Sequence, residues 1–147
     1  MMCKPLILLV EDNQDDEELT LLAFEQSELS AQVAVARDGV EALEYLFATG
    51  IYADRSTATL PVLILLDIQL PRLNGLEVLQ QLRAAPRTRH LPVVILTTST
   101  EQQDLLESYH LGCNSYIQKP VDYDRFLQVL QQLGMYWLAL NTPPPTR

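Results

Sequence analysis

The stretch VLILLD at residues 62–67 gives the plainest indication of the fold, because five aliphatic residues lead directly to the carboxylate of Asp67. Two other aliphatic runs also stop at an oxygen-bearing side chain: LILLV at residues 6–10 precedes Glu11 and Asp12, and VVIL at residues 93–96 precedes Thr97. A further run, SYIQKP at residues 115–120, ends at a lysine and a proline. Short apolar runs without polar alternation are typical of strands buried on both faces of a parallel sheet. We therefore expect the polar side chains that follow these runs to meet at one edge of a sheet.

Segments with helical spacing separate these runs. A fifth run, QVAVA at residues 32–36, completes a series of five strands, each followed by a helix. Right-handed crossovers would place helices on both faces of the sheet. The pattern predicts an α/β fold: a doubly wound, five-stranded parallel sheet with the flavodoxin-like strand order 2-1-3-4-5. Strands one and three are neighbours in that order.

Local signals predict several helix ends. We expect Asp38 to cap the helix after the second strand, with Glu41 at a capping-box-like spacing and Gly50 closing the helix. Pro86 should stop the helix after the third strand. The polar connection at residues 51–60 is long for such a link, and it is either a partner-facing loop or tolerated surface.

Composition limits the possible functions. The 147 residues suit one domain with one core, so we expect a single globular unit without an output domain. The chain has 10 basic and 19 acidic residues, a net charge of −9, and no basic cluster, so we do not expect a nucleic-acid partner. No apolar run has the length of a membrane span, so we expect a cytoplasmic protein without a membrane partner. Cys3 and Cys113 lack the spacing of a redox or zinc site.

The predicted strand order would bring together three carboxylates, those of Glu11, Asp12 and Asp67. Three carboxylates within about 4–6 Å of one another repel and need a compensating cation. Hard oxygen ligands select Mg²⁺ or a similar ion. With the metal bound, Asp67 would attack a phosphoryl donor and form an aspartyl phosphate. Lys119 and the hydroxyl of Thr97 would then hold the phosphoryl oxygens.

These motifs resemble the CheY-like receiver domain of two-component response regulators. Four motifs carry the resemblance: VEDN at residues 10–13, LLDIQLP at 65–71, ILTT at 95–98 and GCNSYIQKP at 112–120. The resemblance implies a signal-transduction phosphoprotein in which Asp67 accepts a phosphoryl group from a histidine kinase in a phosphorelay. It also implies that the chain is not an enzyme beyond slow phosphorylation and dephosphorylation of itself.

The same resemblance implies how the metal and the lysine are held. Asp12 would bind Mg²⁺ directly, Glu11 would support it largely through water, and Gln69 would supply a backbone carbonyl. Pro120 would follow a cis peptide bond that aims Lys119 into the pocket.

Thr97 and Tyr116 resemble the switch pair of this family. On phosphorylation the threonine hydroxyl would move toward the phosphoryl oxygens, and the tyrosine ring would turn inward. The alternative for Tyr116 is an ordinary half-buried aromatic residue on a strand. The readout face would be the fourth helix, the fifth strand and the fifth helix.

The chain continues beyond the point where receiver domains commonly end. We divide it into a receiver domain at residues 1–134 and a C-terminal helical extension with a Pro-rich tail at residues 135–147. An apolar seam with helical spacing runs through both, and its members are Phe126, Leu130, Leu133, Trp137 and Leu140. The seam is either a homodimer interface with Trp137 as its aromatic anchor, or Trp137 folds back onto the flank of the sheet.

The tail, the connection at residues 51–60 and the expected lack of an output domain resemble the single-domain response regulators that are paired with cyanobacterial phytochromes. This narrower resemblance implies a phytochrome histidine kinase as the phosphoryl donor.

Three other functions are compared with this one. A haloacid-dehalogenase-like phosphatase needs a second aspartate two positions after its nucleophile, where this chain has Gln69. A flavodoxin-like FMN carrier would bind phosphate at its first loop, where Glu11 and Asp12 would repel an anion. A binding or adaptor module that works without phosphorylation remains open.

Overall fold

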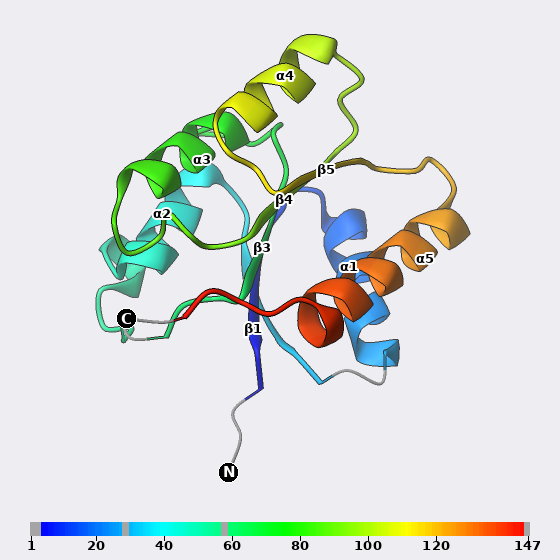
Figure 1. Cartoon of the computed structure of the whole chain (residues 1–147), viewed down its shortest axis with the longest axis horizontal. Helices are drawn as coiled ribbons and strands as arrows, with labels where there is room; N and C mark the ends of the chain where they lie inside the picture. The colour runs from blue at the N-terminus through cyan, green and yellow to red at the C-terminus, as the bar shows by residue number, and fades with distance from the viewer. Residues whose placement is uncertain (1–3, 28–29, 57–58, 146–147) are drawn as a thin grey trace.

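The computed structural model describes residues 4–27, 30–56 and 59–145, so Cys3 lies outside the described part (Figure 1). Over these residues the chain forms a five-stranded parallel sheet in the order β2-β1-β3-β4-β5. The strands are β1 (Leu6–Val10), β2 (Gln32–Ala36), β3 (Leu63–Leu66), β4 (Val93–Thr97) and β5 (Ser115–Gln118). The α-helices are α1 (Gln14–Gln26), α2 (Gly39–Phe47), α3 (Gly75–Ala84), α4 (Gln102–His110) and α5 (Tyr123–Gly134). The predicted fold class and strand order are confirmed.

The sheet separates two hydrophobic cores. Alternate side chains of the central strands point to opposite faces, so Ile7 and Leu65 pack with α1 and α5, whereas Leu8 and Ile64 pack with α2 and α3. All four of these side chains are 0% exposed. Burial of each such side chain stabilises the fold by about 1.5–3 kcal/mol, which explains why the central strands β1 and β3 are unbroken apolar runs. The edge strands β2 and β5 are only partly buried and include polar residues. Figure 1 shows α1 and α5 together on one side of the sheet and the other helices on the opposite side.

The beginning of α2 agrees with the prediction from the sequence, but its end does not. The side chain of Asp38 accepts a hydrogen bond from the Glu41 backbone N–H at 2.7 Å, as expected of an N-cap. The Glu41 carboxylate, however, accepts a hydrogen bond from the backbone N–H of Arg37 at 3.1 Å, and not from the backbone N–H of the cap residue. The helix closes at Ala48 in the left-handed conformation (φ 54°), so the prediction of Gly50 as the closing residue is wrong. Gly50 instead begins the short 3₁₀ helix η1 (Gly50–Tyr52).

The end of α3 agrees with the signal from Pro86. The helix stops at Ala84, and Ala85 is extended, as residues before proline commonly are.

The long connection after α2 is fastened to that helix. The guanidinium of Arg55 lies 3.8 Å from the ring centroid of Tyr45 and donates a hydrogen bond to the Tyr45 carbonyl at 2.9 Å. The hydroxyl of Tyr52 donates to the Glu41 carboxylate at 2.7 Å. The described part of this connection is therefore ordered surface, although residues 57–58 lie outside the description.

The C-terminal extension continues α5 directly as the π-helix η2 (Met135–Leu140). Phe126, Leu130 and Leu133 are 2%, 0% and 6% exposed and belong to the core between α5 and the sheet. Their burial is complete within one chain, so the assignment of these three residues to a dimer interface is corrected to an intramolecular packing role. Trp137 is partly buried against the same core.

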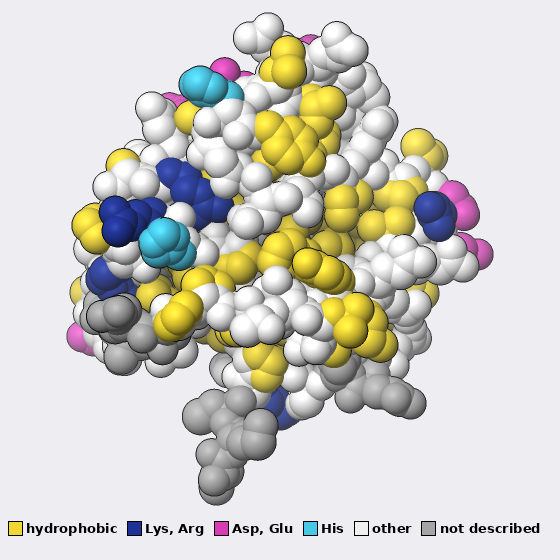
Figure 2. Space-filling model, viewed as in Figure 1, with side chains coloured by type: hydrophobic (Ala, Val, Ile, Leu, Met, Phe, Trp, Pro, Cys, Tyr) yellow, Lys and Arg dark blue, Asp and Glu magenta, His cyan; other side chains and the backbone are white. Residues whose placement is uncertain are grey.

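Part of the extension remains exposed. Met135, Tyr136 and Leu140 are 52%, 49% and 69% exposed. Figure 2 shows apolar side chains gathered on the face where the extension lies. None of the helices in the described residues combines the length and the apolar character that a membrane span requires.

Candidate functional site

Three carboxylates meet at the ends of two neighbouring strands. The pairing of Val10 with Leu66 sets β1 and β3 side by side, and the residues that follow these strands are Glu11, Asp12 and Asp67. One ligand atom from each of the three carboxylates lies within 4.8 Å of the others. Glu11 and Asp67 are buried and Asp12 is exposed, so the cluster opens to solvent on one side. The predicted meeting of the three acids is confirmed.

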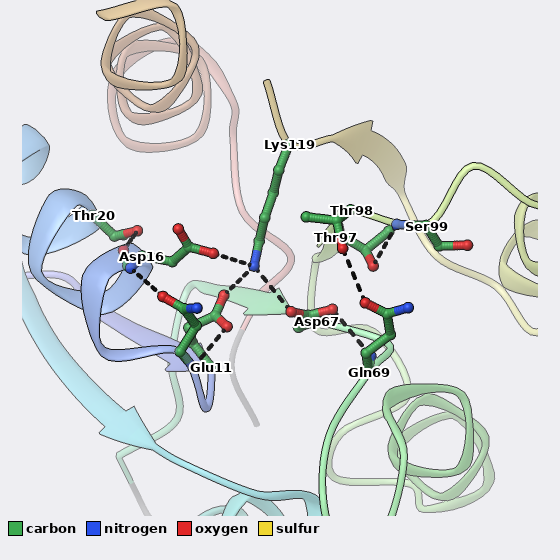
Figure 3. A network of polar contacts seen from close by, with 10 residues as sticks. Glu11, Asp16, Thr20, Asp67, Gln69, Thr97, Thr98, Ser99 and Lys119 are labelled. Atoms are coloured by element: carbon green, nitrogen blue, oxygen red, sulfur yellow. Dashed lines mark hydrogen bonds and ion pairs between the residues drawn. The ribbon is translucent and has the colours of Figure 1, made fainter. Parts of the chain in front are cut away.

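Lys119 enters this cluster from the end of β5. Its ammonium nitrogen lies 2.6 Å from Glu11 Oε1, 2.8 Å from Asp16 Oδ2 and 3.0 Å from Asp67 Oδ2 (Figure 3). Only 3% of the Lys119 side chain is exposed. The three N–H bonds of the ammonium thus have three carboxylate acceptors, which fixes the side chain in the pocket.

The prediction of a cis peptide bond before Pro120 is wrong. No described residue follows a cis peptide bond. The backbone N–H of Lys119 donates to the Thr97 carbonyl at 2.7 Å, and this contact ties the residue to the end of β4. Lys119 reaches the pocket by this strand-end position and through its carboxylate partners.

Burial and charge perturb the two most enclosed groups. Burial raises the pKa of Glu11 to about 7, because the opposing attraction of Lys119 is the smaller effect. Burial works to lower the pKa of Lys119, but the charges of Asp67 and Glu11 outweigh it and the pKa is raised. Lys119 is therefore a permanent cation, whereas Glu11 exchanges its proton near neutral pH.

Gln69 spans the mouth of the pocket. Its backbone N–H donates to Asp67 Oδ1 at 3.0 Å, and its side-chain oxygen accepts from the Thr98 hydroxyl at 3.0 Å. Figure 3 shows this side chain between the ends of β3 and β4. The pocket has a volume of about 350 Å³, and its lining comprises Glu11, Asp12, Asn13, Asp16, Asp67, Gln69, Thr98 and Lys119.

A buried carboxylate with a fixed lysine beside it, inside a metal-capable acid cluster, is an arrangement that suits phosphoryl transfer to an aspartate. A family model described as "Response regulator receiver domain" matches residues 7–131. The chain belongs to the response regulator receiver family. It is thus a receiver domain of the two-component type, and histidine kinases are the partners that this family has in general.

Curated relatives and solved structures support this membership. The "Probable methanogenesis regulatory protein FilR2" of Methanothrix harundinacea is 38% identical and the match covers 95% of this chain and 87% of that protein. "Response regulator Rcp1" of Synechocystis is 34% identical, with coverage of 95% and 92%.

Three solved structures of related regulators resemble this receiver closely. The phosphorylated cyanobacterial phytochrome response regulator RcpA has a TM-score of 0.90 and 38% identity, with coverage of 97% of this chain and 100% of that chain. The Mn²⁺-bound form of Rcp1 has a TM-score of 0.89 and 34% identity, with coverage of 96% and 99%. The bacteriophytochrome response regulator RtBRR has a TM-score of 0.76 and 49% identity, with coverage of 97% and 86%.

The predicted switch pair of the receiver meets at Ser99. Thr97 is fully buried, and its hydroxyl accepts from the Ser99 N–H at 3.3 Å. The Tyr116 hydroxyl donates to the Ser99 carbonyl at 3.5 Å, and its partly buried ring packs against the core. Ser99 Oγ in turn donates to Asp104 Oδ2 on α4 at 2.6 Å. A short chain of contacts therefore links Thr97 at the end of β4 to α4, while the neighbouring Thr98 lines the pocket itself.

Sequence reasoning missed two members of the receiver site, Asp16 and Ser99. Asp16 looked like an ordinary acid in the first turn of a helix, where the dipole favours it. The sequence did contain one signal. Asp16 lies only three residues after the cap residue Asn13, and the first turn of a helix that directly follows a strand lies beside the carboxyl edge of the sheet. Ser99 lies in the loop after β4 and carried no recognisable spacing.

Proposed function

We propose that this receiver accepts a phosphoryl group on Asp67 from a histidine kinase, with Mg²⁺ bound at the acid cluster. The observation that carries the proposal is the position of Asp67, buried at the end of β3, 3.0 Å from the Lys119 ammonium and inside the group of three metal-capable carboxylates. The family match supplies the class of donor.

Asp67 would act as the nucleophile. An electron pair of its carboxylate forms the new O–P bond while the P–N bond to a phosphohistidine breaks, and the electrons of that bond return to the imidazole. The Gln69 N–H and the Lys119 ammonium each hold one oxygen of the carboxylate, which orients the side chain before attack. Lys119 also neutralises charge that develops on the transferred group.

The residues of the acid cluster suit a divalent cation. Glu11, Asp12 and Asp67 offer hard oxygen donors, the type that Mg²⁺ prefers, and the Mn²⁺-bound form of Rcp1 is a related receiver with a divalent ion. When bound, the ion would supply positive charge to the oxygens of the transferred phosphoryl group. Asp12 is the exposed member and would meet the ion first, and the Gln69 carbonyl stays in the proposed ligand set.

Phosphorylation would be read out through Thr97 and Tyr116. Attraction to the new phosphoryl oxygens would draw the Thr97 hydroxyl away from the Ser99 N–H. The Ser99 carbonyl also accepts a hydrogen bond from the Tyr116 hydroxyl, and its side chain donates one to Asp104. A shift of Ser99 would therefore be transmitted to β5 and α4.

We also propose a phytochrome histidine kinase as the donor and a homodimer as the working form. RcpA and RtBRR are phytochrome response regulators by description, and both cover nearly the whole of this chain. The exposed residues Met135, Tyr136 and Leu140 would supply the dimer contact, with Trp137 behind them.

A phosphatase is the weaker candidate. Gln69 stands two residues after Asp67, and an amide cannot serve as a general acid or base at neutral pH. The phosphoryl group would therefore persist on Asp67, as a signal requires.

Mass spectrometry tests the proposal. We expect acetyl phosphate with Mg²⁺ to add one phosphoryl group to the wild-type protein and none to Asp67→Asn. Phosphotransfer from a panel of histidine kinases that includes phytochromes would identify the donor. A phosphorylated Asp67→Asn variant would overturn the assignment of the acceptor.

A further inference from the structure

Asp16 is the unexplained member of the Lys119 network. Unlike Glu11 and Asp67, it does not follow a strand, because it is the third residue of α1. Its carboxylate nevertheless lies 2.8 Å from the Lys119 nitrogen across a separation of 103 residues. Figure 3 shows Lys119 passing between Asp16 on one side and Asp67 on the other. We propose that Asp16 is a positioning residue that holds Lys119 in place for phosphoryl transfer to Asp67, an inference that rests on the proposed function.

The backbone of Asp16 is itself fixed at both ends. Its N–H donates to the Asn13 side chain at 2.9 Å, which is the N-cap contact of α1. Its carbonyl accepts from the hydroxyl of Thr20 at 2.7 Å, and Thr20 is 1% exposed. The first turn of α1 is therefore a rigid support, and the Asp16 side chain is only 19% exposed. A carboxylate held in this way can set the position of a flexible lysine side chain.

Asp16 also differs from the other partners of Lys119 in its relation to the metal site. Glu11 and Asp67 belong to the carboxylate group that can share a cation, and Asp16 does not. With a divalent cation present, these two acids would divide their attraction between the cation and Lys119, and the cation would repel the ammonium. Among the described residues, Asp16 is then the carboxylate partner that serves Lys119 alone.

During transfer, Asp16 would keep Lys119 in place while its other contacts change. As the O–P bond forms on Asp67 and the bond to the donor breaks, one N–H of Lys119 leaves the Asp67 oxygen for a phosphoryl oxygen. Glu11 and Asp16 hold the remaining two N–H bonds. The lysine therefore needs no new rotamer to meet the charge that develops.

The adjacent residue Asp15 provides a matched control. It is exposed, carries the same charge on the same helical turn, and does not line the pocket. At saturating Mg²⁺ we expect Asp16→Ala to lower the rate of phosphorylation by acetyl phosphate about tenfold relative to Asp15→Ala, the effect of losing a hydrogen bond between charged groups. Asp16→Asn retains an acceptor without the charge and should fall between the two. The Mg²⁺ concentration for half-maximal rate should stay within about twofold of wild type, because Asp16 is not a metal ligand.

A double-mutant cycle separates positioning from a general structural effect. In a Lys119→Ala background, Asp16→Ala should change the rate by less than about twofold, since the residue on which it acts is gone. An equal loss in both backgrounds, or an Asp16→Ala rate at least as high as that of Asp15→Ala, would overturn the inference.

Lys119 can also be observed directly in metal-free protein. In ¹⁵N-labelled wild type we expect an ammonium resonance that Lys119→Arg removes, protected from exchange by its three acceptors. Asp15→Ala should keep this resonance, and Asp16→Ala should broaden it beyond detection. A resonance that survives Asp16→Ala unchanged would contradict the inference.

This measurement does not depend on phosphorylation. If wild type takes up no phosphoryl group, the proposed function fails, whatever the resonance shows. If wild type is phosphorylated and Asp16→Ala behaves as Asp15→Ala does, the inference about Asp16 fails alone.

Discussion

The pKa of Glu11 is raised well above its ordinary value, and burial of the side chain is the main cause. At 2% exposure it loses most of its hydration, and this cost of ionisation exceeds the attraction of Lys119. A carboxyl that ionises near neutral pH can release its proton when a cation arrives. If the proposed cation binds there, metal binding and proton release would be linked at this one residue.

The raised pKa of Glu11 predicts how the stability of the metal-free protein depends on pH. The pKa rises from 4.5 to about 7 on folding, so the folded state binds more protons than the unfolded state between these values. Stability is then highest below the unfolded pKa and falls as the pH rises through about 7, by up to about 3 kcal/mol. Denaturant unfolding in EDTA at pH 5 and pH 8 would measure the difference.

Glu11→Gln is the control for this effect, because the amide keeps the shape and cannot ionise. We expect its stability to vary much less than that of wild type over the same pH range. A variant that keeps the full pH dependence would show that another group is responsible.

At the level of elements, the strands were predictable and the helix ends were less so. A run of four or five aliphatic residues leaves little choice besides a doubly buried strand, and every residue of β1, β3 and β4 is buried. The edge strands β2 and β5 are only partly buried, so the expectation of burial on both faces is wrong for them. The bounds of β1, β2 and β5 nevertheless match the runs that the sequence presents. The end of α2 escaped prediction because Gly50 has the greater intrinsic freedom, whereas the chain turns at Ala48. Periodicity likewise showed that Phe126 and Leu130 are buried, but it cannot say whether the same chain or a second copy buries them.

Ala48 predicts a stabilising substitution. The residue has φ 54°, a conformation that costs an alanine about 1 kcal/mol and that glycine adopts freely. We therefore expect Ala48→Gly to raise the free energy of unfolding by about 0.5–1 kcal/mol. Ala84→Gly, at the exposed last residue of α3, should lower it by a similar amount because it only adds flexibility to a helix. The same sign for both substitutions in thermal unfolding would contradict this account.

At the scale of the whole molecule, the charged pocket lies at one edge of the sheet, and the hydrophobic packing lies on its two faces. The carboxyl ends of β1, β3 and β5 carry the charged pocket, and α5 leads on into the C-terminal extension, where Trp137 and Leu138 pack on the core. The pocket follows from the strand order, which the sequence predicts. The Lys119 contact with Asp16 does not, because it joins residues on two elements that no local pattern connects.

The exposed part of the extension allows the proposed homodimer to be tested without damage to the core. Trp137→Ala would remove packing within the chain as well as any contact with a second copy, because Trp137 is partly buried. Leu140 is 69% exposed, and Leu106 on α4 has the same exposure, so the two leucines form a matched pair on different surfaces. An aspartate in place of either leucine should leave the fold intact, since neither side chain belongs to a core.

If the extension forms the dimer, Leu140→Asp should shift sedimentation toward the monomer by placing charge in an apolar contact, whereas Leu106→Asp should sediment as wild type does. Equal dissociation by both variants would mean a broader interface, and dissociation by Leu106→Asp alone would move the contact to α4. If the wild-type protein sediments as a monomer at tens of micromolar, the extension makes contacts only within its own chain. Repeating the measurement on phosphorylated protein would show whether the charge at Asp67 changes this contact.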